Sequence, residues 1–458
     1  MKIVIVGGGN VGQATAKAAL SGNDLHVIEK DATVAENIRN VLPVSILNGD
    51  ASNPNTLRNA IERISPDMLI SAVREDGINI FVCSNAKRFN KKVRTIACIR
   101  NPEFLDKEGY EGVDVFVAPD DLSSDKMIKV ALLENAVNYE KLYFKDYSLT
   151  TFKIERGHQI VGKTVMNIAL PEDCTIVCIY RGDKAITEIS TTEVHPDDRI
   201  VILGTWKATQ EFNELIGIKK EAKEFVILGA GHQGLSIARA ITESGKKNFV
   251  KILDNDINKC REASKQLKKA IVVNGNIVDP QFLLSESIDR ADALISVTDV
   301  DERNLLACMT AMRFGIRKII SRYSIEEYEG IFKYAGIESV VGYHKIIANE
   351  ITRSLRNKAN CAVHVMENRG DFFLGFKLDR GSPMAGEYYG DLVIPEGVNV
   401  CAMIRKGVMT FPDMLTKFEI GDWVLLYTHE VEPLQLTGLL GNNAPEFLRR
   451  CWRVRSGE

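Results

Sequence analysis

A glycine-rich turn that occurs twice constrains the fold of this chain most strongly. An apolar run at residues 3–6 leads into the sequence GGGNVG at Gly7–Gly12, and a run of small residues at Gln13–Leu20 predicts a helix. A second apolar run then ends at the carboxylate of Glu29. Strand, glycine turn, helix, strand and acid follow one another in the order of a dinucleotide-binding βαβ unit.

Each glycine of such a unit, and the acid that follows, has a physical role. Gly7 permits the tight turn, Gly9 lets a pyrophosphate approach the backbone, and Gly12 lets the helix pack closely on the strand. The first N–H groups of the helix face the anion, and Glu29 lies where an acid accepts hydrogen bonds from ribose hydroxyls. The alternative is a turn that packs a Rossmann-like sheet and binds nothing.

Self-comparison shows that the whole chain is an internal repeat with a spacing of about 224 residues. The second glycine turn is Gly229–Gly234, and Asp254 stands where the first copy has Glu29. Further pairs keep the register: Asn48–Asp50 with Asn274–Asn276, Asp67–Val73 with Asp292–Thr298, Asn79 with Asn304, Arg94 with Arg317, Leu170–Arg181 with Ile394–Arg405, and His195–Val201 with Glu419–Leu425. The chain is therefore a duplicated two-domain module.

The pattern of elements predicts an α/β protein with four domains. Residues 1–140 and 225–357 alternate strands and helices, which predicts two Rossmann-like doubly wound parallel sheets. Each is followed by a small β-rich α+β domain, at residues 141–218 and 358–441. The charged stretch Lys219–Glu224 is the best candidate for the linker between the modules.

Several local expectations follow from periodicity. Strands are expected near residues 2–6, 25–29, 44–47, 68–73, 94–98 and 114–117. Apolar residues from Met127 to Leu142 recur at helical spacing, with a counterpart at Ile346–Leu355. Such a helix after the last strand is either an oligomer crossover or packs on its own sheet. In the first small domain, residues 162–170 read as a helical run, and Cys174 and Cys178 are expected to share one face of a strand.

Composition excludes several classes of function. The 458 residues carry a formal net charge of −3 and are 45% hydrophobic, so no nucleic-acid partner is expected. No apolar run approaches the ~20 residues that cross a bilayer, and a strand beginning at residue 2 leaves no room for a signal peptide, so an intracellular protein is expected. The nine cysteines are scattered and form no CxxC motif, so neither disulfides nor a metal site is predicted.

These motifs resemble the Trk-system potassium uptake regulator family, TrkA, which has tandem RCK (KTN) modules. Each module of that family has a nucleotide-binding N-terminal domain and a ligand-sensing C-terminal domain. The resemblance spans almost the whole chain and is carried by Met1–Gly12, Gly49–Ser52, Asp67–Ile70, Ile96–Phe104, Leu170–Glu172 and Pro196–Asp198.

The resemblance implies two sets of nucleotide-binding residues. In the first half these are Gly7, Gly8, Gly9, Asn10, Val11, Gly12, Glu29, Asp50, Ala51, Val73, Arg74 and Arg100. In the second half they are Gly229, Ala230, Gly231, His232, Gln233, Gly234, Asp254, Asn276, Ile277 and Thr298. The first half is expected to be the better site.

Some positions depart from the family pattern. Cys98 stands where the family commonly has an arginine that could meet phosphate, so either Arg100 takes over or the contact is missing. Asn276 replaces the usual aspartate, and Arg74–Gly77 differs from the usual threonine-rich segment. His232 is either a phosphate donor or a solvent-facing turn residue.

The resemblance also implies a function. It implies a cytoplasmic regulatory subunit that binds NAD(H), ATP or ADP and gates a TrkH- or TrkG-like integral-membrane potassium channel or transporter. The subunit would form a homo-oligomer, a tetramer, on the inner face of the membrane, with no catalytic residues. NADP is disfavoured because the carboxylates of Glu29 and Asp254 repel a 2′-phosphate.

Two other functions stay open at this point. A soluble NAD-dependent oxidoreductase would need an acid or base beside the nicotinamide, and only Asp50 and Glu75 stand near the expected cleft mouth. A scaffold whose second site has decayed would explain Asn276. Residues 438–458 have no counterpart in the first half and receive no role.

Overall fold

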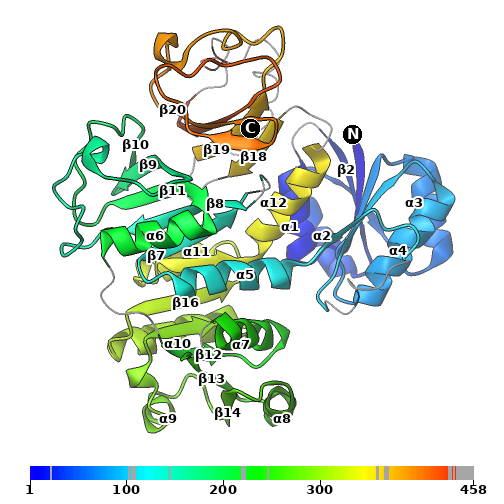
Figure 1. The fold of residues 1–458 in the computed structure, drawn as a ribbon. Coiled ribbons are helices and arrows are strands. Elements are labelled where there is room, and N and C mark those ends of the chain that lie inside the picture. The colour runs from blue at the N-terminus through cyan, green and yellow to red at the C-terminus, as the bar shows by residue number, and fades with distance from the viewer. Residues whose placement is uncertain are drawn as a thin grey trace. The chain divides into compact units, whose positions relative to one another are not determined.

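The chain falls into two compact units, each built from both halves of the repeat. The computed structural model describes residues 1–20, 23–101, 104, 110–142, 144, 146–217, 223–244, 247–356, 361–365, 371–431, 436 and 439, with only the backbone at 18, 348, 351–356 and 361–365. The first unit joins Met1–Ile128 to Lys223–Leu355, and the second joins Lys129–Ala222 to Arg356–Glu458 (Figure 1). The domain ends expected at residues 140, 218, 357 and 441 stay predictions.

The first unit contains two six-stranded parallel sheets of the predicted doubly wound type. The first has the order β3-β2-β1-β4-β5-β6, so the chain reverses direction across the sheet between β1 and β4. Its strands are β1 Lys2–Val6, β2 Asp24–Glu29, β3 Ser45–Asn48, β4 Met68–Ser71, β5 Arg94–Cys98 and β6 Val115–Val117.

Helices cover both faces of this sheet because the strand residues that point to either face are apolar. The helices are α1 Asn10–Ala19, α2 Ala32–Val41, α3 Pro54–Ile64 and α4 Asp76–Phe89. On one face Ile3 and Ile5 pack against α1 and α2, and on the other Val4 and Val6 pack against α3 and α4. α1 begins at Asn10 rather than Gln13, so the end of the glycine turn is also the first turn of the helix.

The second sheet repeats this arrangement in the order β14-β13-β12-β15-β16-β17. Its strands are β12 Glu224–Leu228, β13 Phe249–Asp254, β14 Ala270–Asn274, β15 Ala293–Ser296, β16 Lys318–Tyr323 and β17 Ser339–Gly342. Its helices are α7 His232–Ser244, α8 Ile257–Gln266, α9 Pro280–Ser285, α10 Asp301–Arg313 and α11 Tyr328–Tyr334. Of the expected linker, Glu224 begins β12, and residues 219–222 lie outside the described residues.

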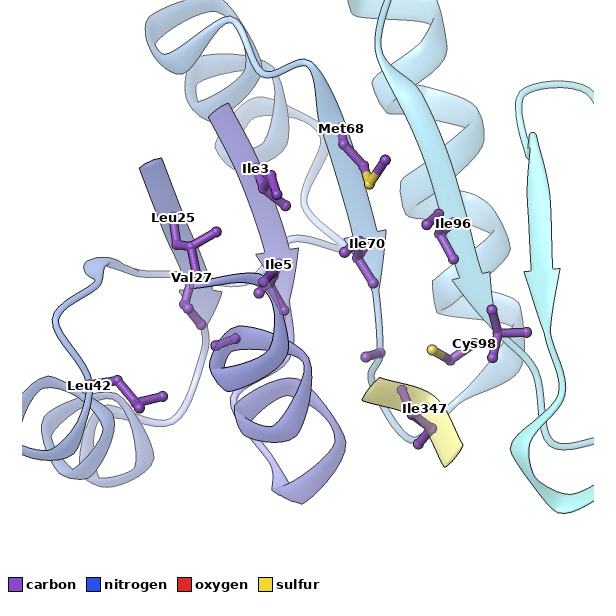
Figure 2. Close-up of a cluster of buried hydrophobic side chains, with 14 of the residues drawn as sticks. Ile3, Ile5, Leu25, Val27, Leu42, Met68, Ile70, Ile96, Cys98 and Ile347 are labelled. Atoms are coloured by element: carbon purple, nitrogen blue, oxygen red, sulfur yellow. The ribbon is translucent and has the colours of Figure 1, made fainter. Parts of the chain in front are cut away.

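A helix after the last strand of each sheet links the two halves. These helices are α5 Pro119–Leu132 and α12 Tyr343–Arg356. Tyr343 and Ile347 of α12 belong to the apolar core of the first sheet, and Figure 2 shows the Ile347 side chain near that of Cys98. α12 therefore packs on the sheet of the first half within the same chain, and a crossover between chains stays a prediction.

The helix predicted up to Leu142 is wrong beyond residue 132. α5 ends at Leu132, and β7 Ala136–Lys141 pairs antiparallel with β8 Tyr147–Lys153. A register shift lies between Ala136 and Asn138. Ala136 and Tyr139, three positions apart, therefore lie on the same face, opposite Phe152 and Thr150, and both are buried. This bulge breaks the alternation of a regular strand, and the resulting pattern of buried positions imitates helical spacing.

The second unit contains two five-stranded sheets, with the orders β10-β9-β11-β8-β7 and β18-β19-β22-β20-β21. The remaining elements are β9 Cys174–Arg181, β10 Lys184–Ile186, β11 Arg199–Thr205, α6 Trp206–Ile216, β18 Cys361–Val365, β19 Asp371–Lys377, β20 Val398–Arg405, β21 Val408–Thr410 and β22 Trp423–His429. The helical run expected at residues 162–170 shrinks to a single 3-10 turn, Val165–Asn167. The predicted fold class, two Rossmann-like sheets with small β-rich α+β domains, is confirmed.

The expectation that Cys174 and Cys178 share a face of β9 is wrong. Cys174 packs in the core under the first small sheet, whereas Cys178 packs in a second core that includes Tyr427 of the other small sheet. The register of β9 on β11 shifts between Val201 and Ile202, which is a bulge in β9. The extra residue moves every later side chain to the opposite face.

Each small sheet also contains the same charged pair, and this pair supports a stability prediction. Arg181 Nε and Nη2 each lie 2.8 Å from an oxygen of Asp198, a fully buried residue. Arg181→Met should lower the free energy of unfolding of the second unit by about 2 kcal/mol, because it leaves a buried carboxylate without its cation. Chemical denaturation followed by circular dichroism measures this. The exposed Lys184→Met is the control, and an equal effect of both variants would contradict the prediction.

Candidate nucleotide site

The two glycine turns have the same backbone geometry. Gly7 and Gly229 have φ angles of +97° and +115°, a region that favours glycine because other residues clash there. Gly7 N donates to Ile28 O at 2.9 Å, and Gly229 N donates to Leu253 O at 2.8 Å. Each turn is therefore fastened to the end of the neighbouring parallel strand.

The last glycine of each turn is required by close packing. A Cβ atom at Gly12 would lie 1.8 Å from Gly7 O, and one at Gly234 would lie 1.9 Å from Gly229 O. No side chain can occupy these positions without a shift of the backbone. The helix thus starts directly against the turn, as the sequence predicts for Gly12.

The middle glycine of each turn faces open space instead. A Cβ atom at Gly9 or at Gly231 would meet nothing within 4 Å. Gly9 is the N-cap of α1 and its position provides no side-chain hydrogen bond to the helix. The first N–H groups of α1 and α7 are therefore directed at a free surface suited to an anion.

The acid at the end of the second strand holds each turn in place. Gly8 N and Asp31 N donate to the two carboxylate oxygens of Glu29 at 2.5 and 2.8 Å. In the second half, Ala230 N and Asp256 N donate to Asp254, both at 2.8 Å. Each carboxylate oxygen keeps a lone pair, so the acid can orient the turn and accept a ribose hydroxyl.

A buried asparagine organises the loop after the fourth strand of each sheet. Asn79 accepts from Val73 N at 2.9 Å and donates to Val73 O and Cys98 O at 2.9 and 2.7 Å. Asn304 makes the matching bonds to Thr298 N and O and to Arg322 O. The pair Asn79 and Asn304, which the repeat singles out, therefore positions the predicted site residues Val73 and Thr298.

The residues after the third strand form the same tight turn in both halves. Asp50 Oδ1 accepts from Ser52 N at 2.8 Å and from Ser52 Oγ at 2.7 Å, and these bonds hold the pKa of Asp50 below its ordinary value. Asn276 Oδ1 accepts from Val278 N at 3.2 Å. The amide of Asn276 therefore performs the turn-forming role of Asp50 without its charge.

The structure locates an arginine that the sequence comparison missed. Because Asn79 and Asn304 bind the same backbone position, Arg322 is the counterpart of Cys98. Pairing Arg94 with Arg317 was one residue out of register, since β4 pairs Met68 with Arg94 and β15 pairs Ala293 with Lys318. The arginine that the first half lacks is thus present in the second half.

Arg322 is held at the second glycine turn by weak contacts. Its Nη1 donates to Gln233 Oε1 at 3.2 Å and lies 3.5 Å from Asp299 Oδ1, and its guanidinium lies 4.7 Å from the centre of the Tyr343 ring. Its buried Nε has no hydrogen-bond partner among the described residues. This donor set suits a phosphate oxygen, which would satisfy the orphaned N–H.

Arg100 occupies a different position from Arg322. Its backbone N–H donates to both oxygens of Asp76, and the equivalent bonds in the second half run from Ser324 N to Asp301. The side chain of Arg100 is exposed, and so is that of His232 in the first turn of α7. The predicted site residues lie at the carboxyl ends of the strands, in the turns that follow them or in the first helical turn, which is where α/β sheets bind ligands.

Two parallel sheets with duplicated glycine turns, each joined to a small antiparallel sheet, define a tandem Rossmann-like protein. The family model described as "TrkA-N domain" matches residues 3–119 and 225–343, and that described as "TrkA-C domain" matches residues 149–217. The chain therefore belongs to the TrkA family, with TrkA-N and TrkA-C domains in tandem. The resemblance inferred from the motifs is confirmed.

Curated relatives match over nearly their full length. The chain is 25% identical over 439 residues to the Trk system potassium uptake protein TrkA homolog 1 of Methanosarcina mazei, covering 93% of this chain and 97% of that protein. It is 26% identical over 462 residues to the Trk system potassium uptake protein TrkA of Halomonas elongata, covering 96% and 99%.

Solved structures share the fold. The GsuK RCK domain matches with a TM-score of 0.62 and 18% identity, over 93% of this chain and 92% of that one. The GsuK channel bound to NAD matches with a TM-score of 0.62 and 18% identity, over 96% of this chain and 78% of that one. Among the described residues of the present chain, no helix has the length and apolar character of a membrane span.

Proposed function

We propose that this protein is a nucleotide-sensing regulatory subunit of a potassium uptake system. It binds NAD(H), and ADP or ATP, at the two glycine turns and acts on a TrkH- or TrkG-like membrane channel or transporter from the cytoplasmic side. The observation that carries the proposal is the free surface above Gly9 and Gly231, each at a helix N-terminus beside a fixed carboxylate. The names of the curated relatives and the NAD bound to GsuK support it.

The residues at the carboxyl ends of the strands and in the turns after them are the proposed nucleotide-binding residues. Main-chain N–H groups of Gly9–Gly12 and Gly231–Gly234 hold the pyrophosphate, and Glu29 and Asp254 accept from ribose hydroxyls. We call the glycine turns Gly7–Gly12 and Gly229–Gly234, each with the acid of the next strand, the first and the second cradle. Arg322 adds a cation to the second cradle, where the first has Cys98. We therefore assign tighter phosphate binding to the second half, which reverses the order expected from the sequence.

A regulatory role fits the carboxylates near the first cradle better than hydride transfer does. A general base works best with a pKa near the operating pH, whereas the bonds from Ser52 lower the pKa of Asp50. Glu75, the other carboxylate expected near the cleft mouth, is exposed at the N-cap of α4, where its side chain makes no capping hydrogen bond. Steady oxidation of bound NADH by a candidate substrate would favour the oxidoreductase alternative instead.

Self-association is supported by an apolar helix face on the second half. Leu306, Met309 and Met312 of α10 are exposed, and Tyr334 of α11 is 95% exposed. The matching face of α4 carries Lys87, which pairs with Asp114 at 2.6 Å. Because large exposed apolar patches mark interaction sites, we assign this face to contacts between copies in a homo-oligomer, a tetramer.

Nucleotide binding would act by shifting the equilibrium between two shapes of the oligomer. A ligand can shift that equilibrium only by its difference in affinity for the two shapes. The test is potassium flux into vesicles that contain the co-purified membrane subunit, with each nucleotide added in turn. A change in flux that Gly231→Asp abolishes supports the proposal, and flux indifferent to every nucleotide contradicts it.

A further inference from the structure

The two crossing helices meet the two cradles with different chemistry. α12 brings Tyr343 and Ile347 into the apolar core of the first sheet. α5 brings polar groups to the second glycine turn, where Gln233 Nε2 donates to Ser123 Oγ at 2.6 Å and Ser123 Oγ donates to Asp120 O at 3.1 Å. The first turn of α5, which belongs to the first half, is therefore fastened to the cradle of the second half.

This attachment places a carboxylate of the first half beside the phosphate-binding groups of the second. Asp120 precedes Ser123 by one helical turn, accepts a hydrogen bond from the Tyr343 hydroxyl and interacts with Arg322, Arg100 and His232. Burial raises the pKa of Asp120 above its ordinary value, although these neighbours favour the charged form. Asp120 and an incoming phosphate would therefore compete for Arg322.

At the position equivalent to Asp120, the first cradle has a histidine in place of the carboxylate. β5 pairs Cys98 with Val117, three residues before Asp120, and β16 pairs Arg322 with Val341, three residues before His344. His344 is thus the counterpart of Asp120. It is buried against the ring of Tyr323, with centroids 5.4 Å apart. At this position of the crossing helices, the negative charge is specific to the second cradle.

We propose that Asp120 makes the second cradle select the pyrophosphate diester of a dinucleotide over a nucleotide with a terminal phosphate. This inference rests on the nucleotide-binding function proposed above. A phosphate diester carries one negative charge, whereas a terminal phosphate carries about −1.5 to −2 near pH 7. The additional negative charge of a terminal phosphate is repelled by the Asp120 carboxylate, and both anions would interact with the same Arg322 guanidinium.

The experiment compares NAD⁺ with ADP by calorimetry in the full-length chain. Gly9→Asp blocks the first cradle in every protein, so that only the second titrates. In this background Asp120→Asn keeps an acceptor for the Tyr343 hydroxyl and removes the charge. Compared with Gly9→Asp alone, the variant that also carries Asp120→Asn should bind ADP about tenfold more tightly, which corresponds to about 1.4 kcal/mol. Its affinity for NAD⁺ should change by less than about twofold.

Asp125→Asn is the matched control, since it removes the same charge from α5 but at a position off the helix face that carries Asp120 and Ser123. It should leave the ratio of ADP to NAD⁺ affinity unchanged. An unchanged ratio in Asp120→Asn, or an equal gain for both ligands, would overturn the assignment to Asp120 while leaving nucleotide binding intact. Absence of binding by any nucleotide in the unmodified chain would overturn the proposed function together with this inference.

Discussion

Alanine at Gly12 is expected to destabilise the first Rossmann-like domain severely, by about 4 kcal/mol or more. The added Cβ atom would lie 1.8 Å from Gly7 O, and both atoms belong to backbone that is fixed on each side. Gly7 is bound to Ile28 O, and Gly12 is in the first turn of α1. The helix must move away from β1, which opens the core that Ile5 shares with α1.

Thermal and denaturant unfolding followed by circular dichroism measures this effect. Gly9→Ala is the control three positions earlier, because its Cβ atom would meet nothing within 4 Å. The free energy of unfolding of Gly9→Ala should lie within about 0.5 kcal/mol of that of the unmodified protein. Equal stability of the two variants would show that the close approach of the helix to the turn does not exist in solution.

Gly231→Asp is expected to abolish nucleotide binding to the second cradle and to leave the fold intact. The position has room for a side chain, and a carboxylate there would stand where the N–H groups of α7 otherwise meet phosphate. Affinity should fall by at least a hundredfold, because the anion loses its site and meets a like charge. Calorimetry on the full-length protein measures both affinity and the number of sites.

Gly9→Asp provides the matched change in the first cradle. If both cradles bind, each single variant retains one site per chain and the double variant retains none. Gly157→Asp, at an open turn position in the first small domain, controls for the added charge. Two sites per chain in Gly231→Asp would contradict the assignment of the second cradle.

Much of the fold could be predicted because the repeat supplies two independent observations of each pattern. The strand before Gly7 and the strand before Gly229 are both short apolar runs, and each is followed by small residues that allow a close helix. Glu29 and Asp254 mark the ends of the second strands in both copies. These signals are local, so they survive without knowledge of tertiary contacts.

Sequence patterns did not identify Arg322 or Asp120, because their roles depend on strand register and on the crossing of α5. Arg322 matches Cys98 only when the backbone bonds of Asn304 and Asn79 are seen, and a slip of one residue conceals it. Asp120 belongs to the first half in sequence but interacts with Arg322 and His232 of the second half. No periodicity within one half contains that information, since it arises from the crossing of α5.

Bulges account for two further errors. In β7 and β9 a single extra residue interrupts the alternation, so buried positions in β7 imitate helical spacing and the two cysteines of β9 lie on opposite faces. Strand pairing decides where such a residue is inserted, and single-sequence patterns do not record pairing. The bulge in β20 lies between Val400 and Ala402, near the position equivalent to that in β9.

The covalent fusion of the two halves gives each cradle its own evolutionary history. In an assembly of identical chains, a substitution such as cysteine for arginine would appear in every copy at once. Here Cys98 and Arg322 are encoded separately, and the crossing helices α5 and α12 differ in composition as well. Each glycine turn can therefore accumulate its own substitutions, and so its own ligand preference under the proposed function, while the paired fold stays the same.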